Sequence, residues 1–163
     1  MLSPGCSTPQ SQEYSFLPWV EGYAVGHDGL DTEHRRLVEI INEIHVAQQT
    51  DPAPARINTL LDMLHQETVD HLRHENSAMR EVSGKVALEK GSHPAALKMM
   101  SDAVLDEHIA EHARSLQKLA FIIRSFGPES NAPSGELGDL LKDWFIEHAI
   151  KYDAHLKAVF QAL

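Results

Sequence analysis

Cysteine is nearly absent from this chain of 163 residues, and basic side chains are scarce. Its single cysteine, Cys6, excludes a disulfide within the chain and a zinc site built from several thiolates. Lysine and arginine number 14 against 24 aspartates and glutamates, which gives a formal net charge of −10. Because binding to nucleic acids and to anionic membrane surfaces depends on basic side chains, we expect neither kind of partner.

Long apolar runs and targeting signals are also missing. No run approaches the roughly 18 residues that a membrane span needs, and the first residues lack the charged and apolar regions of a secretory signal. We therefore expect a cytoplasmic protein with no membrane partner. The composition, 42% hydrophobic and 23% charged, is typical of a globular chain. We expect a single domain over residues 1–163, with an N-terminal arm at 1–30 and a helical part at about 31–162.

Four stretches repeat apolar residues at helical spacing, and segments rich in proline or glycine separate them. The apolar stretches predict four helices. The first covers about 31–49, the second about 52–82, and the fourth about 136–162. The third begins between 94 and 101 and ends at 126. Asp31 and Asp51 are the expected N-caps, and Gly84 is expected to end the second helix. The pattern predicts an all-α fold, an antiparallel up-down-up-down four-helix bundle with an irregular N-terminal lead-in. An irregular helical array and a helical dimerisation module are the alternatives.

Histidine is the residue in excess, with 11 in the chain, and several interrupt the apolar stripes of the predicted helices. His71 and Glu75 are four residues apart, as are His108 and His112, so each pair lies on one side of its helix. A lone buried histidine is ordinary. Polar groups without partners on four buried faces would cost about 1–3 kcal/mol each. Metal coordination would remove that cost, so the pattern indicates a metal site.

Five motifs occur together over about residues 16–160. They are Trp19-x3-Tyr23-x-Val25-Gly26, Asp31-x2-His34-x2-Leu37 followed by Asn42, His71-x3-Glu75-x3-Met79, His108-x3-His112 and Trp144-x3-His148-x4-Asp153. In this combination the chain resembles the hemerythrin family, in particular the single-domain bacterial hemerythrins. The resemblance implies a non-haem centre of two iron ions joined by a bridging oxo or hydroxo oxygen.

The resemblance also implies which side chains bind the irons. The seven ligands would be His34, His71, Glu75, His108, His112, His148 and Asp153. His108, His112 and His148 would bind one iron and His34 and His71 the other, while Glu75 and Asp153 would bridge both. One position would then stay open on the iron held by His34 and His71, and dioxygen would bind there.

An apolar pocket around the open position would exclude water. Its candidate residues, each explained at least as well by ordinary core packing, are Leu37, Ile41, Leu72, Met79, Ile109 and Trp144. The function implied is reversible binding of dioxygen by a carrier or store that is not an enzyme. The alternatives are a di-iron enzyme acting on oxygen, peroxide or nitric oxide, an oxygen or redox sensor, and a protein for metal storage.

Three features depart from the expected pattern. Asp153 follows His148 by five residues, which rotates it by about 140° on a straight helix; a local widening of the helix would bring the two together. Asn76 stands where the family usually has a second acid after Glu75. The long connection at Gly84–Met100 either extends two helices or forms a flap. Of the histidines outside the ligand set, His74 is the nearest to it in sequence, and it either donates a hydrogen bond toward the site or faces water.

Overall fold

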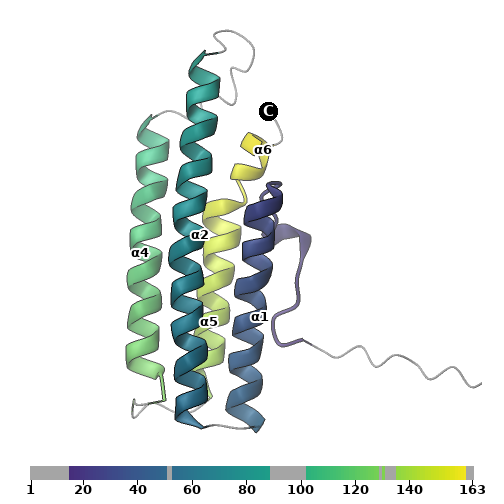
Figure 1. Cartoon of the computed structure of the whole chain (residues 1–163), viewed down its shortest axis with the longest axis vertical. Coiled ribbons are helices and arrows are strands. Elements are labelled where there is room, and N and C mark those ends of the chain that lie inside the picture. Colours follow the sequence, from purple (N-terminus) through teal and green to yellow (C-terminus); the bar gives the residue numbers. More distant parts are fainter. Residues whose placement is uncertain (1–14, 51–52, 89–101, 129, 131–134, 161–163) are drawn as a thin grey trace, which may run out of the picture.

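A computed structural model describes residues 15–50, 53–88, 102–128, 130 and 135–160. The helices form four rods, and these rods lie side by side and alternate in direction (Figure 1). Helix α1 (Asp28–Thr50) packs against α2 (Pro54–Leu88), and α2 packs against α4 (Asp102–Phe126). The last rod begins with α5 (Glu136–Ile146), which contacts both α4 and α1 and so closes the ring. No strand occurs among the described residues, and the predicted all-α antiparallel bundle is confirmed.

The last rod is not the single α-helix that the sequence pattern predicts. After α5 the chain widens into a π-helix, η2 (Glu147–Asp153), and then ends in the short helix α6 (Leu156–Phe160). Because a π-helix bonds residue i to residue i+5, residues five apart lie one turn apart. His148 and Asp153 therefore face the same side, as the expected local widening of the helix requires.

Helix α1 begins at Asp28, three residues before the predicted start, and the prediction that Asp31 is its N-cap is wrong. The Asp31 carboxylate instead accepts hydrogen bonds from the backbone amides of Val25, at 2.7 Å, and Gly26, at 3.2 Å. Gly26 has φ 80°, a left-handed conformation that glycine adopts without steric cost. Asp31 thus fixes the turn that leads into α1.

Helix α2 continues through Gly84 to Leu88, so the prediction that Gly84 ends it is wrong. No atom crowds this position, and a glycine inside a helix costs only about 1 kcal/mol relative to alanine. The first part of the long connection therefore extends α2. The rest of that connection, the predicted cap Asp51 and the predicted start of the third helix before 102 lie outside the described residues. Helix α4 ends at Phe126, as predicted.

The described part of the N-terminal arm packs along the bundle. Leu17 is 1% exposed, and the Asn42 side chain binds both of its backbone groups. The Leu17 amide donates to Asn42 Oδ1 at 2.8 Å, and Asn42 Nδ2 donates to the Leu17 carbonyl at 2.9 Å. Phe16 stacks on the ring of His45, and the 3-10 helix η1 (Glu21–Tyr23) brings Tyr23 into the core. The arm thereby supplies contacts to α1.

The apolar core consists of two clusters. The larger one includes Leu37, Ile41, Leu64 and Leu119, and the smaller one includes Leu30 and Met79. On α1 and α2, the residues between the clusters in sequence include His34, His71 and Glu75, which break the apolar stripes. A polar layer therefore separates the two apolar clusters. No helix in the described part of the chain has the length and apolar character to cross a membrane.

Candidate metal centre

The seven side chains singled out by the sequence are all buried in the polar layer. Their exposed fractions range from 0% to 5%, and every buried histidine, aspartate and glutamate of the described residues belongs to this set. Its members are His34, His71, Glu75, His108, His112, His148 and Asp153. Thr68 is also buried, but its hydroxyl donates to the Leu64 carbonyl of its own helix at 2.7 Å.

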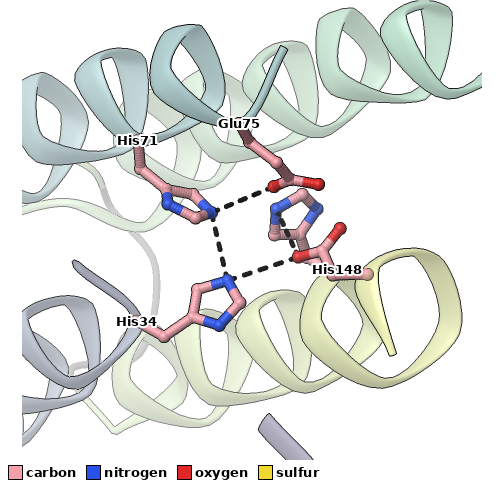
Figure 2. A group of neighbouring side chains, drawn as sticks. His34, His71, Glu75 and His148 are labelled. Carbon is pink, nitrogen blue, oxygen red and sulfur yellow. Dashed lines mark hydrogen bonds and ion pairs between the residues drawn. The ribbon is translucent and has the colours of Figure 1, made fainter. Parts of the chain in front are cut away.

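Two groups of potential metal ligands form within the layer, and in each group the ligand atoms lie within 4.8 Å of one another. The first group contains His34, His71, Glu75, His148 and Asp153, and the second contains Glu75, His108, His112 and Asp153. The two carboxylates belong to both groups, which is the arrangement that two bridged cations require. Figure 2 shows four side chains of the first group turned toward one another, with His34 on α1, His71 and Glu75 on α2, and His148 on η2.

The position of His148 differs from the division of ligands that the resemblance implies. It shares a group with His34 and His71 rather than with His108 and His112. Its ring centroid lies 5.5 Å from that of His112 and 6.0 Å from that of His71, so the ring stands between the two groups. The division into three and two histidines therefore stays a prediction.

Three of the five imidazoles are held by a hydrogen bond on the edge that faces away from the layer. Nδ1 of His34 donates to the Tyr23 carbonyl at 2.6 Å, and Nδ1 of His71 donates to Glu33 at 3.0 Å. Nδ1 of His112 donates to Asn76 Oδ1 at 2.9 Å. Histidines that bind metals are commonly oriented in this way, with Nε2 left to face the ion.

Asn76 therefore provides an acceptor at the position where the family usually has an acid. Its amide oxygen takes the His112 proton without adding a charge to the layer. The departure noted in the sequence thus preserves the hydrogen bond and removes the negative charge.

Glu33 is a contributor that the sequence analysis missed. One of its carboxylate oxygens accepts from His71, and the other accepts from Nδ1 of His74 at 2.6 Å. The His74 side chain is 59% exposed, so it both faces water and bonds toward the site. The sequence did contain a signal for this contact: Glu33 directly precedes His34, and His74 directly precedes Glu75. Each therefore lies next to a residue of the buried layer.

The protonation of the layer follows from burial and from these contacts. Burial alone would lower the pKa of His71, but hydrogen bonds to Glu33 and Glu75 raise it to about 9. Burial lowers the pKa of His112 to about 4 and also lowers the pKa of His148. Burial alone would raise the pKa of Glu75, yet hydrogen bonds from His108 and His71 hold it well below its usual range. At neutral pH the layer therefore holds a protonated His71 beside the neutral imidazoles of His112 and His148 and the ionised carboxylate of Glu75. Binding of a metal ion through His71 would displace the proton from its Nε2.

The contact between His34 and His71 also suits a cation. Their Nε2 atoms lie 3.0 Å apart, and one proton must stand between them. Since His34 already donates through Nδ1, its Nε2 accepts and His71 supplies the proton. A bound cation would take the place of that proton.

Several buried atoms of the layer have no hydrogen-bond partner, which tests whether a metal fits. Among the described residues they are Glu75 Oε2, His112 Nε2, both ring nitrogens of His148 and both carboxylate oxygens of Asp153. An unpaired buried polar group costs about 1–3 kcal/mol. Imidazole nitrogens and carboxylate oxygens are donors that iron and similar cations accept. The donor set therefore fits a pair of metal ions.

The six residues predicted to line an apolar pocket do not form one cluster. Leu37, Ile41 and Trp144 belong to the larger apolar cluster on one side of the polar layer. Met79 belongs to the smaller cluster and Ile109 packs against it on the other side. Leu72 is 3% exposed and belongs to neither cluster. The role of these residues around an open metal position stays a prediction.

Comparisons with known proteins agree with the geometry. The family model described as the Hemerythrin HHE cation binding domain matches residues 25–159. The chain is 28% identical over 107 residues to a bacteriohemerythrin of Stenotrophomonas maltophilia (strain R551-3), an alignment that covers 63% of this chain and 69% of that protein. No solved structure matches the chain significantly.

Proposed function

Because the chain belongs to the hemerythrin family of cation-binding domains, we propose that it binds two iron ions and, through them, dioxygen reversibly. The observation that carries the proposal is the sharing of Glu75 and Asp153 by two groups of buried ligands. A single ion would need only one such group. Two carboxylates common to both groups would hold two ions close together.

The protein's own residues would perform three tasks. The five imidazoles and two carboxylates would bind the ions, together with one bridging oxo or hydroxo oxygen. Glu33, Asn76 and the Tyr23 carbonyl would orient the rings that they accept from. The apolar clusters on both sides of the layer would exclude water. Bound as a ferrous pair, the ions would supply the two electrons that hold dioxygen and would regain them on release.

Metal analysis and optical spectroscopy test the metal part of the proposal. We expect the aerobic protein to contain about two irons per chain, the number that seven ligands with two shared carboxylates accommodate. It should also show charge-transfer bands of an oxo-bridged ferric pair. One metal per chain, or zinc alone, would contradict the proposal.

A mutation pair tests the assignment of the ligands. We expect His112→Ala to lose iron, because its Nε2 faces the layer without a hydrogen-bond partner and lies 3.7 Å from Glu75 Oε1. The matched control is His65→Ala, since His65 is an exposed histidine on α2. Equal iron content in the two variants would remove His112 from the ligand set.

Cycling the reduced protein between oxygen and argon separates a carrier from an enzyme. A carrier returns to its deoxygenated spectrum over many cycles. Rapid conversion to the ferric form with release of peroxide would instead support the di-iron enzyme. Both outcomes require bound iron, so this experiment is interpreted after the metal analysis.

A further inference from the structure

Two cavities open along the side of the bundle where α4 meets η2, and each reaches a buried imidazole of the polar layer. The larger, of about 250 Å³, is lined by His148 among others. The smaller, of about 160 Å³, is lined by Val104, Glu107, His108, Glu111, Tyr152 and His155. Glu111 and Tyr152 line both cavities. On this side of the bundle, two cavities therefore reach buried side chains of the cluster.

The cavities reach the rings of His148 and His108, and these are also the two imidazoles of the layer whose Nδ1 atoms have no hydrogen bond among the described residues. Nδ1 of His148 is buried without a partner, and no hydrogen bond within the described residues engages Nδ1 of His108. His108 is 5% exposed and donates through Nε2 to Glu75 at 2.9 Å. The opposite edge of its ring therefore faces away from the cluster, and the cavity lies against that ring.

The smaller cavity has the chemistry of a passage for cations. Carboxylates, imidazoles and a phenol line it, and neither lysine nor arginine is among its lining residues. Glu111 pairs with Arg114, whereas no ion pair within the described part of the chain engages Glu107. The ring of His155 lies 5.3 Å from that of His108. Glu107 and His155 thus offer ligand atoms beside a ring that belongs to the cluster.

The larger cavity has no net charge among its lining side chains, because two glutamates and two basic residues line it. Its lining includes Arg114 and Lys118, which form ion pairs with Glu111 and Glu147 respectively. Fixed positive charges raise the energy of a cation, and negative walls concentrate cations in a cleft. The charge distribution therefore favours the smaller cavity as a route for metal ions.

We propose that the smaller cavity is a vestibule through which divalent metal ions reach the buried ligands, with Glu107 and His155 as transient contacts on the way to His108. The proposal rests on the metal binding proposed above. The side chains of the vestibule do not converge on one point as the ligands of the polar layer do. An ion would therefore pass through the vestibule and be retained only in the cluster.

The rate of metal uptake tests the vestibule. Ferrous iron is added without oxygen to the full-length apoprotein, and a chromogenic chelator measures the iron that is still free at each time. We expect Glu107→Gln combined with His155→Gln to slow uptake about fivefold to tenfold, because electrostatic steering is reduced. The final iron content should equal that of the unaltered chain, since the cluster is intact. The matched control is Glu43→Gln combined with His65→Gln, two exposed positions on α1 and α2.

A third variant distinguishes the two cavities. Lys118→Gln should leave the uptake rate unchanged if ions pass the vestibule, but should accelerate it if they pass the larger cavity. If the Glu107 and His155 variant takes up iron at the unaltered rate, the vestibule proposal is wrong, but the proposed metal centre is unaffected. Failure of the unaltered chain to bind iron would instead overturn the proposed function.

Discussion

Glu33 connects His71 of the buried layer to a histidine at the surface. Its carboxylate accepts from His71 on one oxygen and from His74 on the other. Acceptors that orient a metal-binding histidine typically change metal affinity by about 10–100-fold when they are removed. We expect Glu33→Ala to lower metal affinity by about that factor, measured by competition with a chelator. His74→Ala should have a smaller effect, because it leaves the bond to His71 in place.

The matched control for Glu33 is Glu43→Ala, which removes an exposed carboxylate from the same helix. It should leave metal affinity unchanged. A Glu33 variant that binds metal as tightly as this control would show that the ring of His71 is oriented by packing alone.

Asn76 gives a second prediction at the scale of single residues. Replacement by leucine removes the acceptor from Nδ1 of His112 and leaves that ring free to rotate or change tautomer. We expect Asn76→Leu to release iron to a chelator faster than the unaltered chain. Asn76→Asp restores an acceptor with a negative charge and should retain iron at least as well. Equal retention in the leucine and aspartate variants would contradict the role of this hydrogen bond.

The side chains that gather in the buried layer were predictable from sequence, because each occupies an apolar face at helical spacing or belongs to a family motif. Tyr23 and Glu33 were not, for different reasons. The Tyr23 contact uses a backbone carbonyl, which every residue has, so the residue type does not predict it. The Glu33 contact depends on how α1 packs against α2, which helical periodicity does not specify.

At the scale of secondary structure, the π-helix is the element on which the ligand geometry depends. Deleting one residue within it gives a regular α-helix, in which His148 and Asp153 are four apart and still face one side. We expect deletion of Lys151, an exposed residue of η2, to preserve the fold and part of the metal binding. Deletion of Asp143, exposed in α5, should rotate the residues on either side by about 100° relative to each other and abolish metal binding.

Metal content and thermal unfolding of the two deletions check this prediction. Both remove one exposed residue from the same rod, so they differ chiefly in the local helix type. If the two variants lose metal and stability equally, the π-helix η2 does not accommodate the deletion of one residue by becoming an α-helix.

Helix existence was easier to predict than helix boundaries. The apolar stripes identified all four rods, but Asp31 and Gly84 carried signals that the folded chain uses otherwise. Asp31 resembles an N-cap, yet it bonds to the turn before the helix. Gly84 resembles a terminator, yet the stretch beyond it stays helical. Local signals of this kind are decided by tertiary contacts and by a balance of about 1 kcal/mol.

At the scale of the whole molecule, the polar layer predicts that stability depends on bound metal. It separates two apolar clusters, so its unpaired atoms lie in the centre of the bundle. A ligand at 100 times its Kd stabilises a fold by about 2.7 kcal/mol, which corresponds to roughly 5–10 °C in Tm for a chain of this size. We expect removal of the metal to lower Tm by at least that amount in a thermal melt. An unchanged Tm would indicate that the layer is satisfied without ions.

Two substitutions in the layer should abolish metal binding and yet change the stability of the apoprotein in opposite directions. Neither ring nitrogen of His148 makes a hydrogen bond, although its Nε2 lies 3.1 Å from Asp153 Oδ2, so His148→Leu removes a poorly satisfied buried group. The apoprotein should gain about 1–3 kcal/mol in free energy of unfolding, because apolar packing replaces that group. His34→Leu should destabilise it, since the Tyr23 carbonyl loses its donor. Denaturant unfolding without metal measures both. Destabilisation by both substitutions would mean that His148 supports the fold as well as the metal.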